Sequence, residues 1–126
     1  MNGVRQRNYM KKPNKRSLKK RADVLFSLNV RKHGRCQFKG LDKIRCSAVL
    51  QCAHIETRGT NKLRFDQQNA LCLCSRHHWY YTNHPADFNK MVQEFFSSQW
   101  KYIEKHKHEL VKFMIEDYQE IIRRLI

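Results

Sequence analysis

Residues 52–78 read CAHIETRGTNKLRFDQQNALCLCSRHH, and this stretch decides which fold the chain can adopt. It contains three of the seven histidines and three of the five cysteines, and Asn69 lies between two of those histidines. Two short apolar segments flank a polar loop at residues 56–68, and Ser75 is a suitable N-cap for a following helix. The stretch therefore predicts two short strands and a helix that bring histidines and cysteines together.

The first of these strands is predicted to end near Ile55, and residues 69–73 form the second. Successive side chains of a strand point to opposite faces, so Cys52 and His54 would share one face while Ala53 and Ile55 share the other. The helix that begins near Ser75 is expected to stop at the Asn-His-Pro segment 83–85.

Positive charge is concentrated in the first part of the chain. The formal net charge is +15 over 126 residues. Residues 1–45 carry 15 Lys and Arg against two acids, a net of +13, whereas residues 46–126 carry 11 against nine, a net of +2. This asymmetry predicts a polyanionic partner, most simply DNA. The alternative is a solvated basic tail that binds nothing.

The basic part divides into an arm and a helix. Residues 1–16 have few apolar side chains and are predicted to form a flexible arm that could follow a phosphate backbone. Residues 17–34 show the apolar spacing of an amphipathic helix that ends at Gly34. Its charged face supplies the candidate nucleic-acid-binding residues Lys19, Lys20, Arg31 and Lys32. An ordinary surface helix is the alternative interpretation.

The segments on either side of the central stretch are less distinctive. Apolar residues between 36 and 55, with Gly40 among them, suggest short strands around a turn. From Ala86 to Ile126 the pattern is helical, with a break near Ser97. Residues 97–126 are predicted to be a C-terminal helix that packs on the core, and a homodimer through that helix is the alternative.

The cysteines are expected to be thiolates rather than disulfides. The N-terminal segment has no apolar core typical of a secretory signal, and the chain has no run of about 18 apolar residues. We therefore expect an intracellular, cytoplasmic protein, in the host cytoplasm if a phage encodes it.

Two Cys/His pairs indicate a structural zinc site. Zinc prefers four sulfur or nitrogen ligands in a tetrahedron, commonly supplied as two close pairs. The candidate ligands are Cys36, Cys46, Cys74 and His77. Buried, unligated thiols are the alternative. The two remaining cysteines, Cys52 and Cys72, compete for ligand positions but are assigned to buried strand positions.

The spacing of His54, Asn69 and His78 resembles that of the HNH endonucleases, the ββα-metal or His-Me finger nucleases. In that family a histidine ends the first strand, an asparagine follows in the loop, and a metal ligand lies on the helix nine residues later. Zinc-stabilised members place a Cys-x2-Cys before the last histidine, and this chain has Cys74-x2-His77 instead.

Three further segments, ADVLFSLNVRKHGRCQ, AHIETRGTNKLRFDQQN and HHWYYTNHPADF, look like the phage recombination and HNH nucleases of the NinG type. This likeness covers roughly residues 21–96. It implies an α+β fold, in which a small zinc-stabilised ββα-metal core at residues 35–96 is flanked by the basic helix and the C-terminal helices. It also implies a DNA-processing or recombination enzyme of a phage or mobile element.

The resemblance assigns a role to each matching residue. His54 would be the general base, the side-chain carbonyl of Asn69 would hold its ring, and His78 would bind a catalytic cation. That cation would be Mg²⁺ or Mn²⁺, with Zn²⁺ or Ni²⁺ as alternatives. Arg58 or Arg64 would neutralise a phosphate of DNA, whether duplex, branched or single-stranded.

One position departs from the family pattern. Many members have an acidic residue or a histidine immediately before the first-strand histidine, and here that residue is Ala53. Either Glu56, Asp66 or His84 completes the coordination, or His54 binds the metal itself. The expected function is a metal-dependent DNA endonuclease. The alternatives are a zinc-stabilised nucleic-acid-binding protein without catalysis and an adaptor that docks partners through its last helix.

Overall fold

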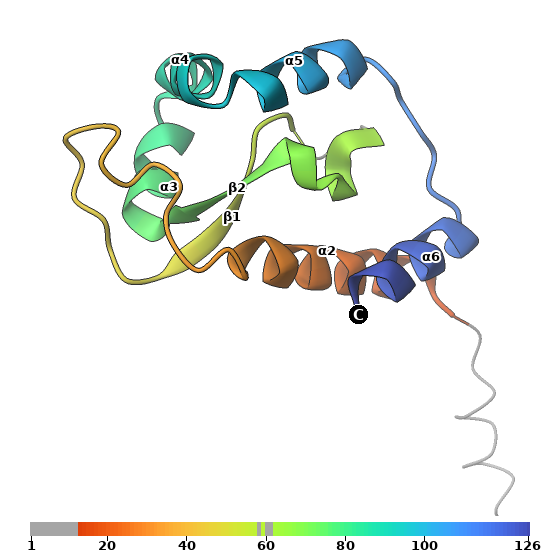
Figure 1. Cartoon of the computed structure of the whole chain (residues 1–126). Helices are drawn as coiled ribbons and strands as arrows, with labels where there is room; N and C mark the ends of the chain where they lie inside the picture. Colours follow the sequence, from red (N-terminus) through yellow and green to blue (C-terminus); the bar gives the residue numbers. More distant parts are fainter. Residues whose placement is uncertain (1–12, 58, 60–61) are drawn as a thin grey trace, which may run out of the picture.

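A computed structural model describes residues 13–57, 59 and 62–126, so most of the predicted basic arm lies outside the described residues. The fold is α+β, as expected, and mostly helical (Figure 1). The helices are α2 (Lys15–Arg31), α3 (Ser75–Thr82), α4 (Pro85–Phe95), α5 (Ser97–His106) and α6 (Ile115–Leu125). The strands are β1 (Leu50–His54) and β2 (Ala70–Cys74), and two short 3-10 helices, η1 (Lys62–Phe65) and η2 (Gln67–Asn69), lie between them.

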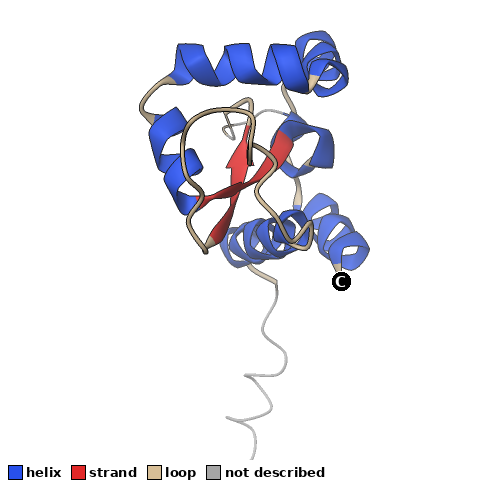
Figure 2. Ribbon diagram, turned by 60° about the vertical axis from the view of Figure 1, so that its left-hand side comes forward, coloured by secondary structure: helices blue, strands red, loops and turns tan. Residues whose placement is uncertain are grey.

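The two strands form an antiparallel sheet with helices around it (Figure 2). Cys52 lies opposite Cys72, and His54 lies opposite Ala70. The hairpin and the helix that follows it confirm the strand–strand–helix order predicted from residues 52–78. Helix α3 is capped by Cys74, whose sulfur accepts from the backbone N–H of His77, rather than by Ser75.

Helix α2 covers one face of the sheet. Asn14 caps it, because its side-chain oxygen accepts from the backbone N–H of Arg16 at 2.8 Å, so the helix begins two residues earlier than predicted. Its buried side chains Phe26 and Val30 pack with Cys72 and Ala70 of β2. The assignment of Cys72 to a buried strand position is therefore confirmed, and Cys52 opposite it is half-buried.

The other face of the sheet carries a second apolar cluster. Phe38 is at its centre and contacts the rings of Tyr81, Phe88 and Phe96. Residues 35–49, which supply Phe38, form turns rather than the short strands expected there, and Gly40 adopts a positive φ of 79°. This segment is held by its side chains rather than by a strand ladder.

The C-terminal part differs from the prediction of one helix over residues 97–126. The break near Ser97 is confirmed, because α4 ends at Phe95 and α5 begins at Ser97. A second break at residues 107–114 separates α5 from α6. Leu110 in that link is 75% exposed and does not continue an apolar stripe.

Helix α6 packs on α2 of the same chain. Tyr118, Ile121 and Ile122 are buried in a cluster with Ala22 of α2. This packing covers the apolar face of α6, and a homodimer through the last helix stays a prediction. Within the described part of the chain, no helix is long and apolar enough to cross a membrane.

The contact between α2 and α6 can be tested by truncating one of its side chains. Ile122→Ala should lower the free energy of unfolding by about 2–4 kcal/mol, because it removes buried methyl groups and leaves a cavity. Leu110→Ala is the matched control and should change it by less than about 0.5 kcal/mol. Urea unfolding measures both, and equal effects would contradict the observed packing.

Candidate metal centre and active site

Four predicted ligands meet in one cluster beside the sheet. The Sγ atoms of Cys36, Cys46 and Cys74 and a ring nitrogen of His77 all lie within 4.8 Å of one another. Cys36 and Cys46 come from the irregular segment 35–49, Cys74 ends β2, and His77 is in the first turn of α3. The cluster thus brings together the irregular segment 35–49, the end of β2 and the start of α3.

The geometry of this cluster fits a tetrahedral zinc ion. Zinc–sulfur and zinc–nitrogen bonds of about 2.3 and 2.0 Å place sulfur and nitrogen about 3.5 Å apart. The Nδ1 atom of His77 lies 3.5 Å from Cys36 Sγ, 3.6 Å from Cys46 Sγ and 3.1 Å from Cys74 Sγ. Three sulfurs and one imidazole nitrogen form a donor set that zinc prefers. The cluster can therefore hold a metal ion such as zinc.

The cysteines of the cluster oppose one another's ionisation. Burial alone would raise the pKa of Cys74, but hydrogen bonds from His77 and Ser47 lower that pKa to about 6. Burial raises the pKa of Cys46, and the neighbouring sulfurs of Cys36 and Cys74 raise it further, to about 12. Negative charge on one thiolate thus opposes ionisation of the next, and a divalent cation would remove that opposition.

A carboxylate outside the cluster orients the His77 ring. The Nε2 atom of His77 lies 2.9 Å from a carboxylate oxygen of Asp42, and the Tyr81 hydroxyl donates to the other oxygen at 2.5 Å. Because a carboxylate accepts, Nε2 carries the proton and Nδ1 is left to bind metal. Asp42 and Tyr81 were not among the predicted site residues. The only sequence signal for Asp42 was its position between two proposed ligands.

The metal centre predicts different behaviour for two cysteines of similar exposure. Cys46→Ser should lower the zinc content and reduce the free energy of unfolding by at least about 3 kcal/mol, because metal binding contributes to folding. Cys52→Ser, on the opposite side of β1, should keep one zinc per chain. Metal analysis with thermal unfolding measures both, and full zinc retention by Cys46→Ser would refute its role as a ligand.

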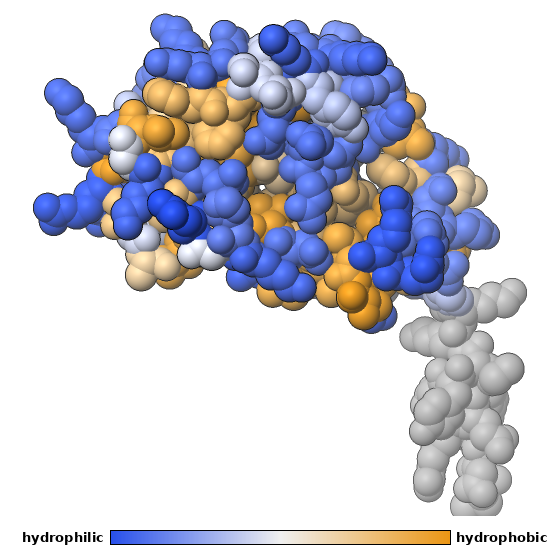
Figure 3. Space-filling view, viewed as in Figure 1, coloured by the Kyte–Doolittle hydropathy of each residue, from blue (hydrophilic) through white to orange (hydrophobic). Residues whose placement is uncertain are grey.

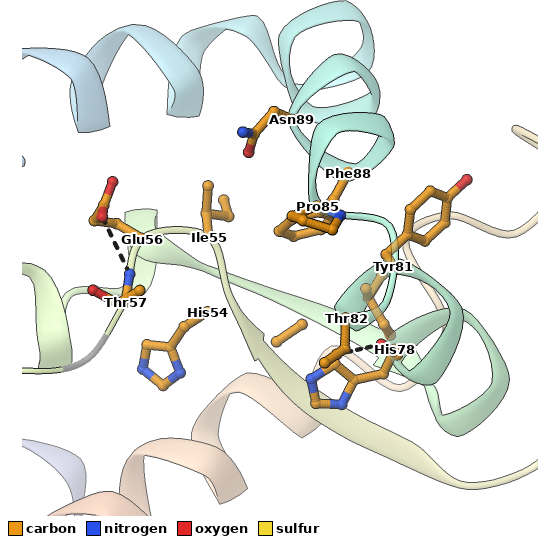
Figure 4. Close-up of a pocket in the computed structure, with 12 residues that line it drawn as sticks. His54, Ile55, Glu56, Thr57, His78, Tyr81, Thr82, Pro85, Phe88 and Asn89 are labelled. Carbon is orange, nitrogen blue, oxygen red and sulfur yellow. Dashed lines mark hydrogen bonds between the residues drawn. The ribbon is translucent and has the colours of Figure 1, made fainter.

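A cavity of about 400 Å³ lies between β1, α3 and α4. His54 and Glu56 line it from the end of β1, and His78 and Thr82 line it from α3 (Figure 4). Pro85 and Asn89 of α4 close the remaining side. The structure therefore brings His54 and His78 to one cavity, and this cavity is separate from the cysteine cluster.

His78 is held in a defined tautomer. Its Nδ1 atom lies 2.7 Å from the side-chain oxygen of Gln51 in β1, so Nδ1 donates a proton and the lone pair is on Nε2. Burial lowers the pKa of His78 below its usual value. A neutral imidazole with one available lone pair is the form that binds a metal.

His54 is held in the opposite tautomer. Its Nε2 atom lies 2.9 Å from the backbone carbonyl of Arg64, which can only accept, so the lone pair is on Nδ1. The ring also stacks on Phe26 of α2, with ring centroids 5.4 Å apart. A backbone oxygen and an aromatic ring together fix the orientation of this imidazole.

Asn69 differs from its expected role. Its side-chain oxygen accepts from the backbone N–H of Glu56 at 2.7 Å, and its amide donates to the carbonyls of Glu56 and Leu63 at 3.2 Å. The residue is fully buried and ties together the two ends of the loop between β1 and β2. The side-chain carbonyl of Asn69 was expected to hold the His54 ring. In the structure the backbone carbonyl of Arg64 bonds to that ring instead, and the Asn69 oxygen accepts from the loop backbone.

The two loop arginines that were expected to neutralise a phosphate are Arg58 and Arg64. Arg64 is only 8% exposed, and its guanidinium pairs with both carboxylate oxygens of Asp23 at 3.0 and 2.6 Å. It was expected to contact a phosphate, but its charge is already used in this pair with α2. Arg58 lies outside the described residues. Lys19 and Lys20 of α2 are exposed, as is Lys32 directly after the helix, and Arg31 donates to the carbonyl of Ser27.

Ala53 is buried and faces the cavity without a ligand atom. Of the three residues proposed to replace it, Glu56 alone lines the cavity. Asp66 accepts from the Tyr102 hydroxyl, and His84 stacks on Tyr80 and bonds its carbonyl. Among these three residues, Glu56 is therefore the one that shares the cavity with His78.

The ion pair between Asp23 and Arg64 should determine which tautomer His54 adopts. Asp23→Asn removes the partner of a buried guanidinium, and we expect a loss of about 2 kcal/mol in unfolding free energy. The Arg64 carbonyl would also lose its fixed position, so the imidazole nitrogen shifts in NMR should show a mixture of His54 tautomers. Glu120→Gln, which breaks the exposed pair with Arg123, is the control and should leave the tautomer unchanged.

Compared with protein-family models, with curated proteins and with solved structures, the chain gives no significant match.

Proposed function

We propose that the protein is a metal-dependent DNA endonuclease of the HNH type, which hydrolyses phosphodiester bonds. The observation that carries this proposal is the pair of histidines in one cavity, each with its tautomer set by a named acceptor. His54 has its lone pair on Nδ1 and His78 has its lone pair on Nε2. Nδ1 of His54 can therefore accept a proton, and Nε2 of His78 can bind a metal ion.

In this mechanism His54 acts as the general base. Its Nδ1 takes a proton from a water molecule that attacks the scissile phosphorus, and the Arg64 carbonyl stabilises the imidazolium that forms. His78, with Glu56 as the candidate second ligand, would hold Mg²⁺ or Mn²⁺, and such a cation would supply stabilisation of charge at the phosphate and at the leaving oxygen.

The cysteine cluster supports this site through its position in the chain. Cys74 caps α3, His77 lies in its first turn, and His78 is the next residue. A metal bound by the four ligands would fix the start of this helix and therefore the direction of the His78 side chain. The net charge of +13 over residues 1–45 supports DNA as the polyanionic substrate.

A second candidate function is a zinc-stabilised nucleic-acid-binding protein without catalysis. The observation that favours it is Ala53, which places a methyl group where many HNH enzymes have a metal ligand. In that case His54 and His78 would be structural, and DNA binding would survive their replacement.

Cleavage of plasmid DNA in Mg²⁺ or Mn²⁺ tests the proposal. His54→Ala should slow cleavage by at least about 100-fold, because general base catalysis contributes that much or more. His78→Ala should also slow it and should raise the Mg²⁺ or Mn²⁺ concentration needed for half-maximal rate. His108→Ala removes an exposed histidine outside the cavity and is the matched control.

Two results would reject the endonuclease. One is the absence of cleavage by the zinc-loaded protein with every divalent cation tried, on linear, nicked and four-way DNA. The other is a His54→Ala variant that cuts as fast as the parent. DNA binding that persists in His78→Ala, without any cleavage by the parent, would instead select the non-catalytic binding protein.

A further inference from the structure

An exposed tryptophan lies directly after His78 on α3. Trp79 is 70% exposed, although tryptophan is a large and mostly apolar side chain. Successive residues of a helix are rotated by about 100°, so Trp79 projects away from the cavity that His78 lines, on the adjoining side of α3. In the described part of the chain, Trp79 belongs to none of the buried apolar clusters.

Two arginines accompany it. Arg76 precedes Trp79 by three residues and so lies on the same side of α3. The Arg76 guanidinium donates to the backbone carbonyl of Arg45 at 3.3 Å, and the Arg76 backbone N–H donates to the Ser47 hydroxyl at 3.1 Å. These bonds join the segment around Arg45 to the start of α3, so both exposed arginines belong to one surface with Trp79.

The positive charge of this surface is not neutralised by nearby acids. Among the described residues, neither Arg45 nor Arg76 forms an ion pair. Asp42 is the acid closest in sequence to Arg45, and its carboxylate is used by His77 and Tyr81. In Figure 3 hydrophilic side chains project from this end of the molecule, where α3 lies in Figure 1.

We infer that Arg45, Arg76 and Trp79 form a binding surface for an unstacked nucleotide of DNA. The guanidinium groups would neutralise phosphates, and the indole would stack on the base. In the interior of a duplex the neighbouring base pairs cover both faces of each base, so away from duplex ends an indole can reach a base face only where a nucleotide is unpaired or unstacked. The surface therefore suits single-stranded or locally unpaired DNA, and the charge of its arginines disfavours an apolar protein partner.

This inference rests on the proposed function in one respect, which is that DNA is the polyanion bound. Binding can be measured without cleavage if no divalent cation is added, so the two proposals can fail separately. The chain has two tryptophans, and Trp100 of α5 is half-buried against the core around Phe38. Trp100→Phe thus leaves Trp79 as the one source of indole fluorescence.

The experiment is a titration of the Trp100→Phe protein with oligothymidine and with relaxed, covalently closed duplex DNA at equal nucleotide concentration, because a closed duplex has no exposed terminal base pairs. Oligothymidine should quench the fluorescence and the duplex should not, because only unpaired bases can stack on the indole. Trp79→Leu in the native chain should weaken oligothymidine binding by about 5- to 150-fold, the range for losing one stacked base. Trp79→Phe keeps a ring and should restore much of the affinity.

The arginines are tested by salt dependence. Arg76→Gln and Arg45→Gln should each reduce the slope of log Kd against log salt by about 0.7, the value for one phosphate contact to a single strand. Lys101→Gln on α5 removes an equal exposed charge elsewhere and should leave the slope unchanged. Undiminished affinity in Trp79→Leu, or equal quenching by the duplex, would overturn the inference. If oligothymidine quenches the fluorescence but the protein cleaves no DNA in the nuclease assay, the binding surface is retained and the endonuclease function is rejected.

Discussion

The meeting of three sulfurs and one imidazole at a single point is the constraint on which this structure depends. Residues 35–49 have no strand or helix of their own, yet they supply Phe38 to the core and two of the four ligands. Without a helix or a strand ladder, the backbone of this segment would by itself be held weakly. A metal ion bound by Cys36, Cys46, Cys74 and His77 would fix it to the sheet and to α3 together.

Three histidines show how neighbouring acceptors can assign different chemistry to the same side chain. Asp42 accepts a hydrogen bond from Nε2 of His77, and Gln51 accepts one from Nδ1 of His78. The Arg64 carbonyl accepts one from Nε2 of His54. His77 and His78 are adjacent in sequence but project to different sides of α3. One belongs to the cysteine cluster and the other to the cavity.

Local features of the sequence predicted much of the fold. The alternation around His54, the polar loop and the N-terminal turn of α3 correctly predicted the hairpin and the helix, and the pair spacing indicated the cysteine cluster. Long-range partners were not predictable in this way. Asp23 lies 41 residues before Arg64, and only the packing of α2 on the sheet brings them together. The unexpected link at residues 107–114 arises because α6 packs on α2 rather than continuing α5.

The contacts of Asn69 were also not predictable from the local sequence. Its type and position were recognised from spacing, but its contacts depend on how the loop closes. In the structure its side chain satisfies backbone groups at both ends of that loop, and a backbone carbonyl takes over the expected contact with His54. A residue can thus be essential to a site's shape without touching the reacting group.

The pair between Asp23 and Arg64 has a consequence for how this architecture can be modified. Because α2 supports the loop that holds His54, this helix is not an interchangeable attachment to a self-sufficient hairpin-and-helix unit. A minimal fragment that begins at the first ligand cysteine would keep the cluster and lose both Phe26 and Asp23. The smallest portable form of this site therefore includes α2, and any graft onto another scaffold has to carry that helix along.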